Sequence, residues 1–190
     1  PIGLDPCSNE NALTCAKTEY RFDKGQDGLT LPWEGHGLVF CNPPYGRKTG
    51  LWLRRMAEMG ARGVEIVGLI AGRPDTVEFQ ACTAPLVCFW RGRLVFLDGD
   101  TGMPCVDKNN KPTAAIFPSA VLYWGPQLKL FQELFTYDKS RPKGQRGGKV
   151  MPWGARYVLS SGSMAIDTSE VCEGCGLKEG HAEACPVWIE

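Results

Sequence analysis

The stretch Phe40-Cys41-Asn42-Pro43-Pro44-Tyr45-Gly46 ends a run of apolar residues with two consecutive prolines. The apolar run at residues 37–41 is typical of a short buried strand. Because proline has no backbone N–H to donate to a neighbouring strand, the strand cannot continue through the two prolines. In open α/β sheets, ligands bind at the carboxyl ends of the strands. An asparagine, two prolines and an aromatic ring at that position therefore predict a binding site.

The residues after this turn predict a strand, a helix and a second strand. Residues 51–59 place apolar side chains at helical spacing, and glycines follow at positions 60 and 63. Residues 64–71 form a nearly continuous apolar run, as in a central strand covered on both faces. This order indicates a parallel sheet and an α/β fold. The patterns farther on predict a short helix at 76–83, strands at 86–90 and 94–97, a strand at 114–124 that is antiparallel and near the end of the sheet, a helix at 127–135 and a hairpin strand at 151–160.

The residue types of the proline turn suit a reaction at an exocyclic amine. Such an amine is a poor nucleophile because its lone pair is delocalised into the ring of the base. The side-chain oxygen of Asn42 and the backbone carbonyl of Pro43 can accept hydrogen bonds from the amine, which favours a nitrogen whose lone pair points at an incoming methyl group. The ring of Tyr45 can stack on a base that has left its helix. The alternative is a purely structural Asn-Pro turn at the end of a strand.

The tetrapeptide Asn42-Pro43-Pro44-Tyr45 resembles motif IV of the S-adenosylmethionine-dependent amino-methyltransferases. The wider pattern resembles the phage-type, Dam-like DNA N6-adenine methyltransferases. The segments that carry this resemblance, in collinear order, are Leu4-Asp5-Pro6-Cys7-Ser8 with Asn11-Ala12, Asp27-Gly28-Leu29 with Trp33, residues 41–46, Gly92-Arg93-Leu94-Val95-Phe96 and Pro118-Ser119-Ala120.

This resemblance implies a Rossmann-like methyltransferase sheet, S-adenosylmethionine as cofactor, DNA as partner, and the cytoplasm of the bacterial host of a phage or prophage as location. It implies direct in-line transfer of a methyl group to the N6 amine of a flipped-out adenine. The catalytic residues would be Asn42, Pro43, Pro44 and Tyr45.

The resemblance also implies where the cofactor lies. Its methionine part would be approached by the residues of the first strand end, Asp5, Pro6, Cys7 and Asn9, although this loop departs from the Gly-rich motif I of methyltransferases generally. Asp27 would bind the ribose hydroxyls or the adenine amine. The residues alone leave two alternatives open: a short helix that begins at Ser8 or Asn9 and runs to Ala16, and a solvated turn at Asp27. The resembled family usually has an upstream Trp-x-Thr-Pro segment that helps to enclose the cofactor, and we expect this domain to lack it.

Basic residues gather at positions 138–150, among glycines and prolines: Lys139, Arg141, Lys143, Arg146 and Lys149. Such a stretch is typical either of a flexible arm that contacts DNA phosphates or of a solvated linker. Arg73, in the loop after the strand at 64–71, could contact phosphates or face solvent. The loop at 98–112 is rich in Gly, Asp, Asn, Lys and Pro and is expected to be exposed. The resemblance makes that loop a reasonable place for target contacts.

The carboxyl terminus carries metal-ligating residue types at the spacing Cys172-x2-Cys175-x5-His181-x3-Cys185. Three thiolates and one imidazole can close a tetrahedral Zn²⁺ site without an open position for water, which predicts a structural zinc. The spacing resembles that of retroviral-type zinc knuckles, Cys-x2-Cys-x4-His-x4-Cys, shifted by one residue. Thiol redox chemistry and a chance cluster are the alternatives. A knuckle could dock on nucleic acid or fold a tail too short for its own core.

The composition is ordinary for a globular protein, with 43% hydrophobic and 22% charged residues. No apolar stretch approaches the length of a membrane span, and no signal sequence is visible at the amino terminus. The formal net charge of zero excludes DNA binding by bulk charge, so affinity must come from local patches. Most of the nine cysteines stand singly in apolar contexts, as reduced cytosolic thiols do. We expect a methyltransferase domain at 1–137, the basic arm at 138–150, a terminal strand region at 151–168 and a zinc-knuckle-like tail at 169–190.

Two other functions remain compatible with the sequence. The same tetrapeptide occurs in enzymes that methylate RNA bases or protein glutamine, and the basic stretch and the knuckle favour nucleic acid over protein. The second is a non-catalytic, zinc-containing nucleic-acid-binding protein that keeps the fold but has lost the cofactor.

Overall fold

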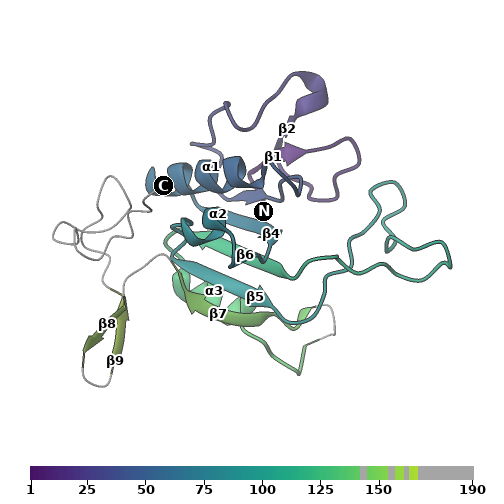
Figure 1. The fold of residues 1–190 in the computed structure, drawn as a ribbon. Helices are drawn as coiled ribbons and strands as arrows, with labels where there is room; N and C mark the ends of the chain where they lie inside the picture. Colours follow the sequence, from purple (N-terminus) through teal and green to yellow (C-terminus); the bar gives the residue numbers. More distant parts are fainter. Residues whose placement is uncertain (142–144, 154–156, 161–162, 167–190) are drawn as a thin grey trace.

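The computed structural model shown in Figure 1 describes residues 1–141, 145–153, 157–160 and 163–166. The elements are β1 (Leu4–Ser8), β2 (Thr18–Arg21), η1 (Phe22–Lys24), β3 (Val39–Cys41), α1 (Thr49–Ala61), β4 (Ile66–Ala71), α2 (Val77–Gln80), β5 (Leu86–Trp90), β6 (Ser119–Trp124), α3 (Leu128–Phe135), β7 (Gly148–Pro152), β8 (Tyr157–Ser160) and β9 (Ser163–Ile166). A mixed seven-stranded sheet has the order β2-β1-β3-β4-β6-β5-β7, and β8 pairs with β9. The pairs β1–β2, β1–β3 and β3–β4 are parallel, whereas β6 is antiparallel to β4 and β5, and β7 to β5. Strands β1 to β5 therefore run in one direction, and β6 and β7 run against them.

The strand, helix and strand predicted around the prolines are confirmed. β3 ends at Cys41, and β4 lies parallel to it, with Val39 opposite Ile66 and Cys41 opposite Gly68. Helix α1 packs directly on β4, because a Cβ atom at Gly68 would lie only 2.6 Å from the sulfur of Met56 in α1. This packing fixes the path of the chain on both sides of the proline turn.

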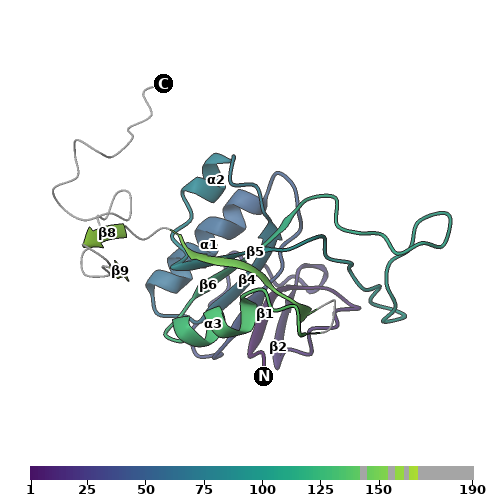
Figure 2. The same cartoon turned by 90° about the horizontal axis from the view of Figure 1, so that it is seen from below.

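Side chains of β6 alternate between two cores. Leu122 and Trp124 belong to the cluster that contains the buried residues of α1 and α2. Val121 and Tyr123 belong to a second cluster, around Phe131 of α3. Successive strand residues point to opposite faces of a sheet, so α1 and α2 cover one face and α3 the other, as Figure 2 shows. The expected α/β fold is therefore confirmed as a mixed sheet with helices on both faces.

Two expectations about the second half of the sheet are wrong. The strand expected at 94–97 makes only isolated bridges, from Val95 to Ala114 and from Leu97 to Pro104. The cause is visible in Figures 1 and 2, where residues 91–118 extend away from the sheet and leave no strand beside them. The strand expected at 114–124 begins at Ser119 and is antiparallel, but it lies between β4 and β5 rather than near the end of the sheet. All six of its residues are buried, as in a central strand.

The helix considered between Ser8 and Ala16 does not form. The side chain of Asn9 accepts a hydrogen bond from the backbone N–H of Asn11 at 3.0 Å, and such a local bond competes with a helix. Cys15 has a φ of 49°, in the left-handed region. The sequence patterns did not predict β2, because its four residues are too few for a periodic pattern.

The basic stretch is shorter than expected, because residues 148–150 already belong to β7. This strand pairs with β5 along its whole length, from Gly148 opposite Trp90 to Pro152 opposite Leu86. The partly buried Val150 packs against the second core and holds the strand in place. In the described part of the chain, no helix is long and apolar enough to cross a membrane.

Asp5 is a buried acid in β1, with 4% of its surface exposed. Its carboxylate accepts hydrogen bonds from the backbone N–H of Cys7 at 3.1 Å and from the hydroxyl of Thr14 at 2.9 Å. Burial raises the pKa of Asp5 above 3.8, and the bonds from Cys7 and Thr14 oppose that rise. The carboxylate therefore ties the end of β1 to the loop that follows it.

Replacing Thr14 with valine removes one donor from this carboxylate and keeps the shape of the side chain. We expect the free energy of unfolding to fall by about 1–3 kcal/mol at pH 7. Losing the bond raises the folded-state pKa of Asp5 further. Because the unfolded parent and variant titrate alike, this pKa difference lowers the stability of the variant only where Asp5 is ionised in the folded parent. The loss should therefore shrink as the pH falls through the folded-state pKa of Asp5, which lies above the usual aspartate value of 3.8.

Urea denaturation at neutral and acid pH measures this difference. Thr18→Val in β2 is the control, because that hydroxyl has no hydrogen-bond partner among the described residues. An equal loss at both pH values would contradict the role assigned to the Asp5 carboxylate.

Candidate active site

A cavity of about 540 Å³ lies at the sheet edge where β1 and β3 end. Three segments far apart in the sequence line it: residues 6–9, residues 26–29 and residues 42–45. The remaining lining side chains are Tyr20, Phe22, Lys48, Trp52 and Phe96. Of the site residues predicted from the sequence, the cavity brings together Pro6, Cys7, Asn9, Asp27, Asn42, Pro43, Pro44 and Tyr45.

A second cavity of about 550 Å³ adjoins the first and shares five lining residues with it: Cys7, Ser8, Asn9, Asn42 and Phe96. It extends along residues 11–14 on one side and residues 94–100 on the other. Asp5, which was expected to approach the cofactor directly, lines this second cavity and not the first. Because its carboxylate is already bonded to Cys7 and Thr14, Asp5 shapes the loop rather than offering a free acid.

Asn42 lies between the two cavities, half-buried at the end of β3. Its side-chain amide has no hydrogen-bond partner in the part of the chain that the structure describes. Pro43 beside it is buried, whereas Pro44 and Tyr45 are exposed. A half-buried amide without a protein partner is free to bond a ligand, because buried polar groups are otherwise satisfied within the protein.

Tyr45 makes an edge contact with Phe96, at 6.2 Å between ring centroids and 68° between ring planes. Although 39% of the Tyr45 surface is exposed, partial burial of its phenol raises the pKa of Tyr45 to about 12, so the phenol is neutral at physiological pH. Phe96 was not among the predicted site residues, although it lies in one of the segments that carry the family resemblance. It reaches the site from the extended segment at 91–118, and no local pattern in the sequence indicates that contact.

Asp27 and Gly28 form the opposite wall of the first cavity. One carboxylate oxygen of Asp27 accepts a hydrogen bond from the backbone N–H of Leu29 at 3.0 Å, and the other has no partner among the described residues. A Cβ atom at Gly28 would lie 1.8 Å from the carbonyl oxygen of Pro6, so only glycine permits this approach. Asp27 is therefore both a turn residue and a residue with an acceptor left for a ligand.

Several of the predicted phosphate-binding cations have protein partners. Arg73 forms a two-point ion pair with Asp75, at 3.0 and 2.8 Å. Arg141 donates to the carbonyls of Glu133 and Leu134 and so caps the last turn of α3. Arg146 donates to the carbonyl of Arg141 at 3.1 Å and supports this cap.

The remaining basic residues divide into two sets. Lys139 and Lys149 are exposed, and neither forms an ion pair or side-chain hydrogen bond within the described residues. Lys143 lies outside the described residues, as do the predicted zinc ligands Cys172, Cys175, His181 and Cys185. Where the structure does describe the chain, it holds no group of three or more metal-ligating side chains. The zinc knuckle thus stays a prediction.

The comparison with known families gives one match. Residues 1–146 match the model of the Dam family, described as DNA N-6-adenine-methyltransferase. No curated protein matches the chain. The matched region spans more than half of the 190 residues and includes every residue that lines the two adjoining cavities. The family's activity is adenine methylation in DNA, and its methyl donor is S-adenosylmethionine. The chain therefore belongs to the Dam family of DNA N6-adenine methyltransferases.

Proposed function

We propose that this protein methylates the N6 amine of adenine in DNA by direct transfer, with the adenine flipped out of the duplex and held beside Asn42. The observation that supports this site is the convergence of residues 6–9, 26–29 and 42–45 on one cavity. Membership of the Dam family supports the reaction and the methyl donor in general. The roles of the individual residues are our proposal.

The lining of the first cavity fits S-adenosylmethionine. A volume of about 540 Å³ falls within the range of small-molecule sites, about 300–1,000 Å³. The aromatic rings of Tyr20 and Phe22 suit an adenine ring, and the free carboxylate oxygen of Asp27 can accept hydrogen bonds from ribose hydroxyls. Asn9 and the peptide groups of residues 6–9 offer donors and acceptors to the methionine end. When bound, the cofactor would supply an electrophilic methyl group to the amine: the N–C bond forms in line with the C–S bond that breaks, and the methylated nitrogen then releases one proton to solvent.

The chain's own contribution is to hold and prepare the amine. The side-chain oxygen of Asn42 and the carbonyl of Pro43 accept hydrogen bonds from the two N–H groups of the adenine amine. These bonds direct the lone pair of the amine nitrogen out of the ring plane. Pro43 suits this role because its φ is fixed and it has no N–H to compete for the base. Tyr45 and Phe96 offer aromatic surface to the flipped base. No covalent enzyme intermediate is needed, so no cysteine acts as a nucleophile.

DNA phosphates are proposed to run along the same sheet edge, past the start of β7. Because β5 runs parallel to β3 and β4, its last residue, Trp90, ends at the edge where the proline turn lies. Lys149 stands opposite Phe89 there, and a further cavity is lined by Arg91, Tyr137 and Lys149. The guanidinium of Arg91 lies 4.3 Å from the centre of the Tyr137 ring, which holds its charge at this edge.

The test of the proposed reaction is transfer of a labelled methyl group to duplex DNA by the full chain, with and without Asn42→Ala. We expect the variant to lose about 10²-fold or more in the transfer rate, because one acceptor of the reacting amine is gone. Its affinity for S-adenosylmethionine should be nearly unchanged. Gln132→Ala, which removes an exposed side-chain amide in α3 away from both adjoining cavities, is the control and should methylate as the parent does.

Two substrates complete this test. DNA without adenine should accept no label. Transfer to structured RNA but not to DNA would refute the proposed substrate, and an Asn42→Ala variant with full activity would refute the proposed role of the amide.

A change of Lys149 to alanine tests the proposed path of the DNA. Loss of one phosphate contact should weaken DNA binding and lower the slope of log Kd against log salt concentration by about 0.9. Affinity for S-adenosylmethionine should not change, because Lys149 does not line the first cavity. Lys129→Ala, at the start of α3 and near the opposite sheet edge, is the control. An unchanged salt slope in Lys149→Ala would place the DNA elsewhere.

A further inference from the structure

Residues 27–36 form neither a helix nor a strand, and the first three of them, residues 27–29, line the first cavity. A buried backbone without ladder partners must have its polar groups satisfied in another way. Side chains do this here: Trp33 donates its indole N–H to the carbonyl of Gly28 at 2.8 Å, Arg55 donates to the carbonyl of Leu31 at 2.8 Å, and Tyr20 donates its hydroxyl to the carbonyl of Pro32 at 2.6 Å. We name this stretch, residues 27–36, the wall segment.

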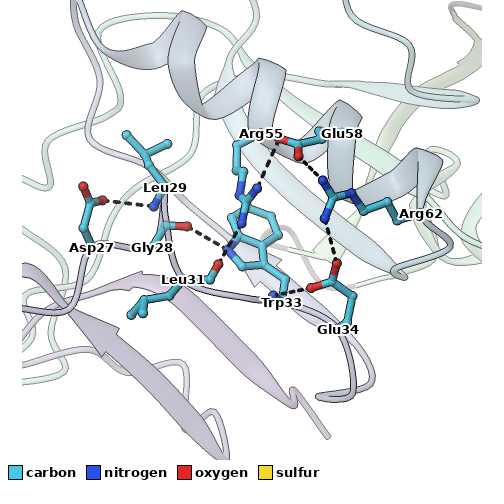
Figure 3. Close-up of polar contacts among 9 residues, drawn as sticks. All are labelled: Asp27, Gly28, Leu29, Leu31, Trp33, Glu34, Arg55, Glu58 and Arg62. Atoms are coloured by element: carbon cyan, nitrogen blue, oxygen red, sulfur yellow. Dashed lines mark hydrogen bonds and ion pairs between the residues drawn. The ribbon is translucent and has the colours of Figure 1, made fainter.

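Arg55 of α1 contacts the wall segment in two ways. Its guanidinium donates to Leu31, and it lies 5.8 Å from the centre of the Trp33 ring. A third contact, to Glu58 at 3.1 Å, keeps the guanidinium oriented. Only 14% of the Arg55 side chain is exposed, so these contacts are shielded from water. Figure 3 shows Arg55 between the helix and the wall segment.

A series of ion pairs connects the same part of α1 to the wall segment. Glu58 also pairs with Arg62 at 2.6 Å, and Arg62 pairs with Glu34 at 3.3 Å. Glu34 in turn accepts the backbone N–H of Trp33 at 3.0 Å, as Figure 3 shows. The wall segment is thus attached to α1 at Leu31, at Trp33 and at Glu34. Arg55 is the most buried charge of the set, since the side chains of Arg62, Glu58 and Glu34 are each more than 40% exposed.

Trp33 links the residues that hold the wall segment to residues that line the first cavity. Its ring is fully buried and stacks on Trp52, a cavity-lining residue, at 6.4 Å between centroids. Its indole holds Gly28, which in turn packs against Pro6 without room for a Cβ atom. A shift of Trp33 would therefore move Gly28 and Asp27 together, and both line the cavity.

We propose that Arg55 is a positioning residue for cofactor binding. It holds the wall segment so that Gly28 stays packed against Pro6 and Asp27 faces the cofactor. Arg55 itself lines neither of the two adjoining cavities. Its effect falls on affinity for the cofactor and not on the transfer step, because Asn42 and Tyr45 belong to a different segment, after β3. A lysine cannot replace Arg55 fully, because only the planar guanidinium group can donate to both Leu31 and Glu58 while it covers the Trp33 ring. This inference rests on the proposed function.

The experiment compares Arg55→Met and Arg55→Lys with the parent chain. Arg54→Met is the matched control, because Arg54 is the next residue of α1, is exposed and has no partner among the described residues. Calorimetry measures Kd for S-adenosylmethionine, steady-state assays separate KM from kcat, and amide hydrogen exchange without cofactor follows residues 29–31 and 33.

For Arg55→Met we expect Kd and KM for S-adenosylmethionine to rise by about tenfold or more, with kcat at saturating cofactor nearly unchanged. The hydrogen-bonded amides of Leu29, Thr30, Leu31 and Trp33 should exchange faster, and Arg55→Lys should recover part of the affinity. Arg54→Met should match the parent in every measurement.

Three results would overturn the proposal. One is a parent-like Kd in both Arg55 variants. Another is a fall in kcat with unchanged Kd, which would place Arg55 in the transfer step. The third is loss of thermal stability alone in Arg55→Lys, with unaltered cofactor affinity, which would make its role purely structural. If the parent chain itself binds no S-adenosylmethionine, the proposed function fails as well, and that result is distinct from the other three.

Discussion

The end of β3 at Cys41 is the constraint on which the rest of the site depends. Two prolines follow one residue later, and neither can donate to β1 or β4, so the chain must leave the sheet. Asn42 therefore lies outside the ladder, at the edge where the parallel strands β1 and β4 also end, and its side-chain amide has no partner among the described residues. A strand that continued past Cys41 would pair Asn42 with its neighbours and fill the space between the two cavities. The same prolines that set the fold thus expose the group proposed to bind the reacting amine.

The wall segment, residues 27–36, contributes no strand and is therefore not held in place by the sheet. Ordering ten residues without secondary structure costs about 1–2 kcal/mol per residue in backbone entropy. The full burial of Trp33 and the hydrogen bonds that satisfy the carbonyls of Gly28, Leu31 and Pro32 oppose that cost. The wall segment is held by α1, whose first turn follows the proline turn directly. One helix therefore supports both sides of the cavity, through the chain on one side and through Arg55 on the other.

Sequence reasoning succeeded where the decisive signal was local. Apolar runs, helical spacing and prolines predicted β3, α1 and β4. The family resemblance, rather than any local pattern, implied that residues 6–9 and residues 42–45 serve one site, and both segments line the first cavity. Sequence reasoning failed where the outcome depends on pairing between distant segments. The place of β6 between β4 and β5 follows from burial on both its faces, which no short pattern reveals. Phe96 contacts Tyr45 because residues 94–100, near the start of the extended segment, line the second cavity beside the site. Arg141 looked like a free cation, but the end of α3 needed a donor, and Arg141 supplies it.

The most direct test of this account is a crystal structure of the full chain with S-adenosylhomocysteine, the product left after transfer of the methyl group. The account predicts electron density for the product in the first cavity, with its ribose against Asp27, its amino-acid end along residues 6–9 and its sulfur facing Asn42. Density at another place on the protein, or in the cavity with the sulfur turned away from Asn42, would contradict the proposed arrangement of cofactor and amine.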